Sequence, residues 1–353
     1  MLIVEDEEGP RHALTIILRP FFHLLTAGSQ QDALQALRDH HVDLMTLDIR
    51  LPDGSGLDVL RTARREYPWV ETVVITGYGS LKSSQDALQA GAAGYLLKPF
   101  NVRDLIDLLN QTLEKKQRLD YLRGFLRTAR GSWAEGRQAR TEWAQLIKEY
   151  HAIPRAQPVP VPTQGTFTEH LPLLSELIEA TGRHWLTHAN RVRAYALLMA
   201  NPMNLSPTKK DILSMGAFLH DIGRIPLGLW QVDISQEEET PDRHPDIGAR
   251  MVYPFRMPHE AVQIIAQHHE QHDGSGYPNG LKGDAIAPLA RIVGIAQAFD
   301  HMTVFSAAEP LPIETACERI LSRAGSGFEA QLAELFVDQV LHSKERLSTL
   351  AST

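Results

Sequence analysis

Histidine and aspartate residues in the C-terminal half of the chain form its most informative chemical pattern. The chain holds 16 histidines among 353 residues. His184 and His188 stand four apart in a helical context, so both would project from one face of a helix. A single histidine has little diagnostic value, but here several metal-binding side chains gather. Seven lie within about 85 residues, and these are His184, His188, His220, Asp221, His244, His268 and His269.

This donor set predicts a catalytic metal centre. Nitrogen and carboxylate donors together suit Fe, Mn, Zn, Co or Ni. The cluster contains no thiolate, which argues against a structural zinc site. Two metal ions bridged by one aspartate and a water would supply a hydroxide near neutral pH and clamp a phosphodiester. The pattern therefore indicates metal-dependent hydrolysis.

A second group of polar residues follows short apolar runs near the N-terminus. Glu5 and Asp6 come after the first run, and Asp48, Thr76 and Lys98 end later ones. The carboxyl ends of parallel strands open on one edge of a sheet, so these side chains should converge. Clustered carboxylates suit Mg²⁺. With Lys98 they suit phosphoryl transfer to an aspartate.

Two kinds of periodicity place these residues on different folds. The apolar runs Leu2–Val4, Leu44–Leu47, Thr72–Ile75 and Gly94–Leu97 alternate with helical patterns. Such alternation predicts a doubly wound α/β domain with a parallel sheet. From Phe167 onward apolar residues recur only at helical spacing, so the second domain is predicted to be all-α.

A polar helical segment separates the two patterns. Residues 114–150 carry nine basic and five acidic side chains, a local charge of +4. Apolar residues at Leu119, Leu122 and Leu126 fit either a dimerising helix or a helix packed on its own domains. An anion-binding surface is a third interpretation. Alternating prolines then predict a semi-rigid linker over 152–165. We expect three regions, which are 1–113, 114–166 and 167–353.

Composition narrows the classes of function. The formal net charge is −8, so the chain has no overall positive field that would attract nucleic acid. The C-terminal half offers no basic recognition helix, so we expect no direct DNA binding. No apolar run approaches the length of a membrane span. The single cysteine, Cys317, and an opening without a signal peptide pattern favour the cytoplasm.

The N-terminal motifs resemble the receiver domain of two-component response regulators over about 1–113. The matching strings run from Leu2 to Glu7, Leu47 to Gly54, Ile75 to Tyr78 and Leu97 to Phe100. The resemblance implies Asp48 as phosphoacceptor and a sensor histidine kinase as partner. It also implies Mg²⁺ held by Glu5 and Asp6, phosphoryl contacts from Thr76 and Lys98, and Tyr95 as the aromatic that reports phosphorylation. Lys98-Pro99 is a candidate cis peptide.

The C-terminal motifs resemble the HD-GYP subfamily of HD-domain metal phosphohydrolases. The matching strings run from His188 to Val192, Leu219 to Ile225, His244 to Gly248 and His268 to Leu281. The resemblance implies hydrolysis of cyclic di-GMP at two transition-metal ions such as Fe or Mn, with Asp221 bridging them. The other implied ligands are His188, His220, His244, His268 and His269. A substrate-side loop would contain Gly274, Gly276, Tyr277 and Pro278.

The chain departs from that subfamily at several positions. Arg224 stands where a catalytic-site lysine is usual, and it keeps the charge without the compact geometry. Gln297 replaces an aspartate that binds metal in the subfamily, and Asp300, one turn on, is a candidate substitute. His184 stands where some members have a glutamate ligand. The stretch after Thr303 lacks the basic residues that usually hold phosphate.

These features together predict a response regulator whose phosphorylation at Asp48 controls a cyclic di-GMP phosphodiesterase. Control would be a population shift between two arrangements, with a homodimer through the connector helix as one way to transmit it. The alternative is a weak or inactive HD-GYP output that acts as a nucleotide-binding or protein-interaction module.

Overall fold

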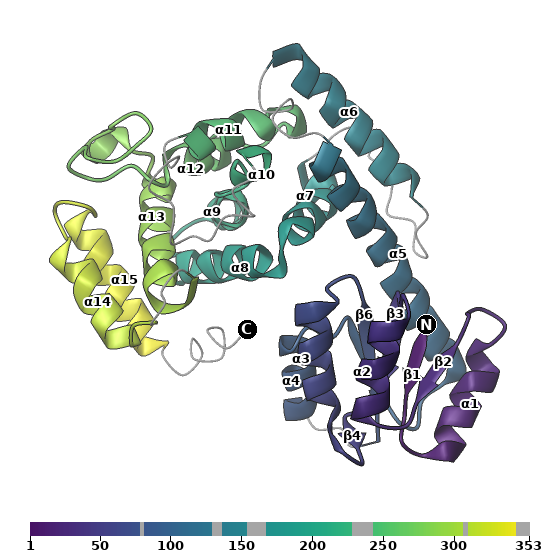
Figure 1. The fold of residues 1–353 in the computed structure, drawn as a ribbon. Coiled ribbons are helices and arrows are strands. Elements are labelled where there is room, and N and C mark those ends of the chain that lie inside the picture. The colour runs from purple at the N-terminus through teal and green to yellow at the C-terminus, as the bar shows by residue number, and fades with distance from the viewer. Residues whose placement is uncertain (78–80, 129–135, 154–166, 228–242, 306–309, 344–353) are drawn as a thin grey trace. The chain divides into compact units, whose positions relative to one another are not determined.

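The structure is a computed structural model that describes residues 1–77, 81–128, 136–153, 167–227, 243–305 and 310–343. The chain divides into two compact units (Figure 1). The first is built mainly from residues 1–118, and the second from residues 119–152 and 160–353. Each unit has its own core and is described separately.

The first unit contains a five-stranded parallel sheet in the order β2-β1-β3-β6-β7. Its strands are β1 (Leu2–Val4), β2 (Leu25–Ala27), β3 (Leu44–Leu47), β6 (Glu71–Thr76) and β7 (Gly94–Leu97). The four predicted runs are confirmed as strands. The edge strand β2 is an addition, because only one of its three residues is buried and the apolar signal is too short to detect.

Helices cover both faces of this sheet, which confirms the doubly wound fold. They are α1 (Glu8–Leu18), α2 (Gln30–Asp39), α3 (Gly56–Glu66), α4 (Leu81–Gln89) and α5 (Val102–Thr128), and a small hairpin pairs β4 (Arg50–Leu51) with β5 (Gly54–Ser55). Successive strand residues point to opposite faces. Accordingly Leu2 and Val4 pack with residues of α2 and α3, whereas Ile3 packs with residues of α1 and α5.

Serine caps begin two of these helices. The side chain of Ser29 accepts a hydrogen bond from a backbone N–H in the first turn of α2. Ser55 does the same for α3. Such caps satisfy a donor that the helix cannot satisfy itself, and each stabilises by about 1 kcal/mol. They fix where the chain turns from the strand ends into the helices.

The second unit is helical throughout its described elements, as predicted. Its helices are α6 (Gly136–Ala152), α7 (Phe167–Thr181), α8 (Arg183–Leu198), α9 (Pro207–Leu219), α10 (Arg224–Leu227), α11 (His244–Met251), α12 (His259–Gln267), α13 (Pro288–Asp300), α14 (Ile313–Ser322) and α15 (Ala330–His342). A π-helical turn, His301–Phe305, continues α13. Pro207 and Pro288 stand in the first turns of α9 and α13, where the missing N–H costs nothing.

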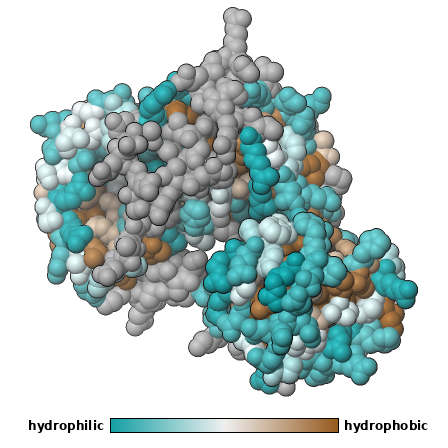
Figure 2. Space-filling view, in the orientation of Figure 1, coloured by the Kyte–Doolittle hydropathy of each residue, from teal (hydrophilic) through white to brown (hydrophobic). Residues whose placement is uncertain are grey.

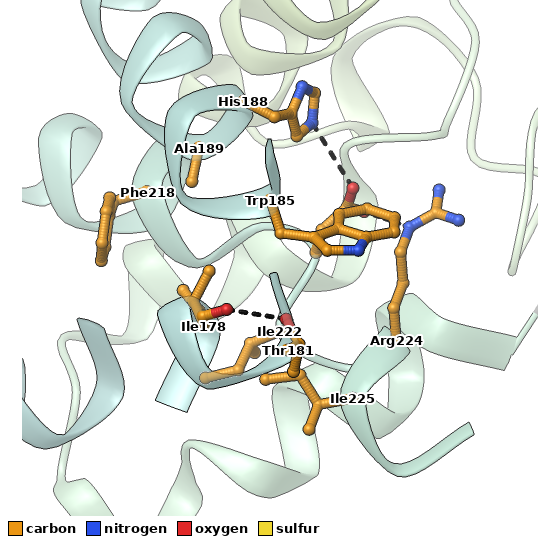
Figure 3. A pocket seen from close by; sticks show the side chains of 10 residues that line it. Ile178, Thr181, Trp185, His188, Ala189, Phe218, Ile222, Arg224 and Ile225 are labelled. Atoms are coloured by element: carbon orange, nitrogen blue, oxygen red, sulfur yellow. Dashed lines mark hydrogen bonds and ion pairs between the residues drawn. The ribbon is translucent and has the colours of Figure 1, made fainter. Parts of the chain in front are cut away.

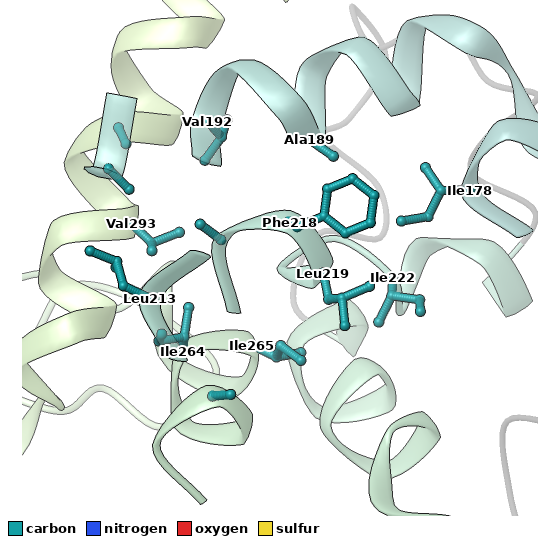
Figure 4. Packing of buried hydrophobic residues seen from close by; sticks show 14 of the residues in the cluster. Ile178, Ala189, Val192, Leu213, Phe218, Leu219, Ile222, Ile264, Ile265 and Val293 are labelled. Atoms are coloured by element: carbon teal, nitrogen blue, oxygen red, sulfur yellow. The ribbon is translucent and has the colours of Figure 1, made fainter. Parts of the chain in front are cut away.

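One hydrophobic core joins these helices (Figure 4). Leu213 on α9, Ile264 on α12 and Val293 on α13 are fully buried in it. Burying one such side chain stabilises the fold by roughly 1.5–3 kcal/mol. The core holds α8, α9, α11 and α12 together, and His188, His220, His244 and His268 lie on or directly after these helices.

The polar segment predicted at 114–150 forms the end of α5 and the whole of α6, with residues 129–135 outside the described part of the chain. Leu119, Leu122 and Leu126 are buried in the core of the second unit. The apolar stripe of this segment therefore packs within the chain, as expected for a helix packed on its own domains.

The coloured surface visible in Figure 2 is mostly hydrophilic, with smaller hydrophobic areas between the hydrophilic ones. Among the described helices, none combines the length and hydropathy needed to cross a bilayer.

Candidate functional site

The acidic group of the first unit gathers at the carboxyl ends of the parallel strands. Lys98, which follows β7, donates from Nζ to Glu5 Oε2 at 2.5 Å and to Asp48 Oδ2 at 2.7 Å. Glu5 follows β1, Asp48 follows β3, and the buried Thr76 ends β6. The parallel register thus brings side chains together that lie up to 93 residues apart in sequence.

These carboxylates can hold a hard cation. Glu5, Asp6 and Asp48 each offer an oxygen atom, and the three atoms lie within 4.8 Å of one another. Burial raises the pKa of Glu5, and its contact with Lys98 opposes that rise. Burial would lower the pKa of Lys98, but its bonds to Asp48 and Glu5 outweigh this and the pKa is raised. The lysine therefore stays charged beside the carboxylates.

Two further receiver features are present near this edge. The Lys98-Pro99 peptide bond is cis, as predicted. The Tyr95 hydroxyl lies 3.3 Å from the Ser83 hydroxyl on α4. The aromatic that the resemblance singles out is therefore linked to a neighbouring helix.

Asp221 is the centre of the second site. Its Oδ2 lies 3.5 Å from His188 Nε2 and 3.4 Å from His220 Nε2. Its Oδ1 lies 3.1 Å from His244 Nε2 and 3.5 Å from His268 Nε2. The two carboxylate oxygens thus face two different sets of histidines, which is the arrangement that lets one aspartate serve two metal ions.

Four helices deliver these histidines. His188 lies within α8, His220 directly follows α9, His244 begins α11 and His268 directly follows α12. The approach of α11 to the site requires a glycine, because a Cβ at Gly223 would lie 2.0 Å from the His244 carbonyl oxygen. Gly223 therefore allows the chain after Asp221 to pass against the start of α11.

Each of three imidazoles is held by its outer nitrogen. Nδ1 of His220 and Nδ1 of His268 each lie 2.8 Å from the backbone carbonyl three residues earlier, and each donates to it. His188 Nδ1 lies 2.7 Å from Asp300 Oδ2. These bonds fix the ring orientations and turn each Nε2 toward Asp221, where its lone pair can bind a metal ion, as is usual around metal-binding histidines.

Asp300, the candidate substitute ligand, is placed behind the histidines. Arg191 donates to both of its oxygens, at 2.6 and 3.1 Å, and the carboxylate is fully buried. Burial would raise the pKa of Asp300, but His188 and Arg191 lower it. The carboxylate is therefore occupied in orienting His188. Arg191 lies in a motif quoted above, three residues after His188, and this spacing was the signal for its role.

Gln297 lies beside His269 at the other end of the cluster. Its Nε2 is 3.3 Å from His269 Nε2, and its Oε1 is buried without a hydrogen-bond partner. His269, Asp221, His244 and His268 offer ligand atoms within 4.8 Å of one another. The amide that replaces the expected carboxylate therefore points its polar end at this group.

The glycine-rich loop packs on the same histidine. The Tyr277 ring stacks on the His269 ring with centroids 4.5 Å apart and planes 16° apart. A Cβ at Gly276 would lie 2.3 Å from a backbone nitrogen of residues 269–271, so only glycine fits. Gly274 has a φ of +86°, and the Tyr277-Pro278 bond is cis. The loop is thereby folded tightly against the cluster.

Arg224 and His184 occupy different surroundings. Arg224 Nε lies 2.9 Å from Asp221 Oδ1, and its guanidinium covers the Trp185 ring at 5.7 Å (Figure 3). A small apolar cavity of about 20 Å³ adjoins them, which is room for about one water. His184 is exposed, contacts Trp185, and belongs to neither metal-binding group among the described residues.

The electrostatics favour the metal-binding form at Asp221, His268 and His269. Burial opposes ionisation of Asp221, yet Arg224 and the histidines hold its pKa well below the usual value. Burial lowers the pKa of His268 to about 3 and that of His269 well below its usual range. Metals bind neutral imidazole and ionised carboxylate. These three side chains are therefore in the forms that bind a cation at neutral pH. Burial opposes protonation of His188, but its contacts with Asp221 and Asp300 outweigh burial and raise its pKa.

Unsatisfied buried atoms show that this donor set fits metal ions. Both carboxylate oxygens of Asp221 and Oε1 of Gln297 are buried without hydrogen bonds. Arg224 forms an ion pair with Asp221 at 2.9 Å, and a cation between the carboxylate and the histidines would satisfy the remaining acceptor capacity of these atoms. His301, which sequence reasoning missed, lies nearby with its ring 5.4 Å from that of His188. His301 follows Gln297 by four residues, about one helical turn, and this spacing was the sequence signal that could have placed it near the site.

Comparison with known proteins identifies a family for each of the two domains. Residues 1–110 match the response regulator receiver domain, and residues 172–332 match the HD domain. The chain is a response regulator with an HD domain. The cyclic di-GMP phosphodiesterase response regulator RpfG of Xanthomonas campestris is 28% identical to it, over 86% of this chain and 77% of that protein.

Two other relatives of this response regulator are named for cyclic dinucleotides. A cyclic di-GMP phosphodiesterase of Thermotoga maritima is 26% identical, over 96% of this chain and 89% of its own length. A 3'3'-cGAMP-specific phosphodiesterase 2 of Vibrio cholerae is 31% identical, over 47% of this chain and 33% of its own length.

Proposed function

We propose that this response regulator is a metal-dependent phosphodiesterase that hydrolyses cyclic di-GMP under the control of phosphorylation at Asp48. The observation that carries the proposal is the position of Asp221 between two sets of histidines, with a different set facing each carboxylate oxygen. The names of the relatives supply the substrate class.

The residues of the cluster have separate roles in this proposal. Two transition-metal ions, when bound, would supply a hydroxide and polarise a phosphate oxygen. Asp221 would hold both ions, with His188 and His220 on one side and His244, His268 and His269 on the other. Arg224 keeps Asp221 ionised through the 2.9 Å contact. The Tyr277 ring limits the movement of His269.

The receiver site provides the control. Mg²⁺, held by Glu5, Asp6 and Asp48, would neutralise the incoming phosphoryl group. Asp48 would accept it from a sensor histidine kinase, and Lys98 would exchange its carboxylate contact for the phosphoryl oxygens. Thr76 lies at the end of the adjacent strand, in position to contact the phosphoryl group.

The alternative, an inactive binding module, has less support, because six ligand side chains are present and buried or nearly so. One experiment separates the two functions. Purified protein with measured metal content is incubated with cyclic di-GMP, with and without acetyl phosphate and Mg²⁺. We expect turnover that Asp221→Ala abolishes together with bound metal, and that changes with acetyl phosphate only if Asp48 is intact.

Each step has its own contradicting result. Full metal occupancy in Asp221→Ala rules out the bridging role. Phosphoryl labelling of Asp48→Asn at the wild-type level rules out that phosphoacceptor. Metal-loaded wild type that turns over no cyclic dinucleotide, including 3'3'-cGAMP, rules out the enzyme.

A further inference from the structure

A second and larger cavity opens beside the metal-binding cluster. Its volume is about 320 Å³, within the range of sites that hold small ligands. His269 and Gln297 line one part of it. Its other lining residues include Arg319, Arg323, Met302, Ile320 and Phe328. We call this cavity the arginine pocket.

The two arginines lie on one face of the chain around α14. They are four residues apart, Arg319 in the last turns of the helix and Arg323 as its C-cap, so they project in a similar direction. Arg319 is exposed. Arg323 is held in place, because it donates to Gln271 Oε1 at 2.8 Å and its guanidinium stacks over Phe328 at 4.8 Å.

The charge balance of the arginine pocket favours an anion. The one acidic side chain among its lining residues is Glu270. Both oxygens of Glu270 accept backbone N–H groups of the glycine-rich loop at 2.8 Å, so the carboxylate is committed to holding that loop. The two guanidiniums therefore outnumber the one carboxylate among the described lining residues, which leaves a formal charge of +1 with the histidines neutral.

We propose that the arginine pocket binds one nucleotide of the cyclic dinucleotide substrate, with Arg319 and Arg323 on the phosphate that is not being cleaved. This inference rests on the proposed function and adds the substrate contacts to it. Guanidinium groups bind phosphate through paired, charge-assisted hydrogen bonds. The apolar side chains of Met302 and Ile320 suit the flat face of a base.

This assignment explains how phosphate could be held although the expected basic residues are missing. The segment after Thr303 lacks the basic residues expected to hold phosphate, yet the substrate is a dianion that must be held next to the metal ions. The arginine pocket supplies two positive charges from a different helix while it shares His269 and Gln297 with the metal centre. One ligand can therefore contact both the metal centre and the arginines.

The test compares Arg319→Ala, Arg323→Ala and the double variant with wild type, using cyclic di-GMP as substrate and metal content as a measure of an intact centre. We expect KM to rise about tenfold for each lost arginine, with a smaller change in kcat, because each removes a charge-assisted contact. Arg319→Lys should recover part of the affinity. Arg250→Ala, which removes an exposed arginine on α11, is the matched control and should leave KM unchanged.

The outcomes separate this inference from the proposed function. Wild type that hydrolyses cyclic di-GMP, with an unchanged KM in the double variant, overturns the role of the arginine pocket and leaves the proposed function standing. Wild type that neither binds nor hydrolyses cyclic di-GMP overturns both. Arg319 is exposed, so Arg319→Ala should leave the fold intact. Its KM therefore tests the arginine pocket even if loss of Arg323 disturbs the packing on Phe328.

Discussion

Single residues decide how many metal ions this site holds, and Gln297 is the most informative of them. A neutral amide binds a divalent cation more weakly than a carboxylate does and offsets none of its charge. We therefore expect wild type to bind one metal ion per chain tightly and a second weakly. Gln297→Asp should raise both the metal stoichiometry and the phosphodiesterase rate, measured by elemental analysis and by turnover of bis-(p-nitrophenyl) phosphate.

The gain should appear with that generic substrate before it appears with cyclic di-GMP, because affinity for the nucleotide depends on other side chains. Two tightly bound metal ions and brisk hydrolysis of cyclic di-GMP in wild type would contradict the expectation. In that case Gln297 Oε1, which is buried without a hydrogen bond, completes the site as it stands.

Asp300 is a second residue that we expect to affect metal binding, and it acts through His188. Its carboxylate orients His188 and is itself held by Arg191. Asp300→Asn keeps the size and removes the charge, so we expect metal affinity to fall about 10- to 100-fold, the usual effect of losing a partner behind a metal ligand. Metal titration measures this, with the exposed Asp246→Asn as control. Unchanged affinity would show that Arg191 and the helix packing alone orient His188.

The helices and strands show which parts of the fold and the site can be predicted from the sequence. Four of the five sheet strands, the helical second unit and the convergence of Glu5, Asp48 and Lys98 follow from periodicity, because parallel strand ends must meet at one edge. The direction of side chains on α13 does not follow from periodicity. Asp300 and Gln297 are three residues apart, yet Asp300 meets α8 and Gln297 meets the end of α12. Only the packing of these helices decides that.

Burial of histidines where these helices end also predicts a pH dependence. The pKa of His301 is lowered to about 3 by burial, as is that of His268, and that of His269 is lowered as well. In the unfolded chain these groups titrate near 6.5. Below that pH the unfolded state binds more protons than the folded state, so the free energy of unfolding falls as pH falls.

The raised pKa of His188 acts in the opposite direction and offsets part of this loss. The pKa values of Asp221 and Asp300 are lowered, so these groups stop stabilising the folded state only at a pH below the usual pKa of a carboxylate. We therefore expect metal-free protein to lose on the order of 1 kcal/mol per buried neutral histidine between pH 7.5 and 5.5. Denaturant unfolding at several pH values measures it, and His301→Gln should reduce the slope. A stability that is flat over this range would contradict the burial argument.

At the scale of the whole molecule, α5 is the element that both units share. Leu105 and Leu109 lie in the core of the first unit, and Leu119, Leu122 and Leu126 lie in the core of the second. A single continuous helix, Val102–Thr128, therefore joins the receiver unit to the unit that contains the HD domain. A change in the packing of its first half can shift the population of arrangements in the second unit.

Weakening this helix between the two cores should uncouple the sites without damage to either. Gln111 and Gln117 are exposed, so Gln111→Gly with Gln117→Gly weakens the helix by about 1 kcal/mol per position and removes no core contact. We expect phosphodiesterase turnover without phosphodonor to stay near wild type, while its response to acetyl phosphate is reduced several-fold. The matched pair of substitutions to Ala keeps the helix and should keep the response. If the glycine variant responds to acetyl phosphate as fully as wild type, the signal does not depend on the continuity of α5.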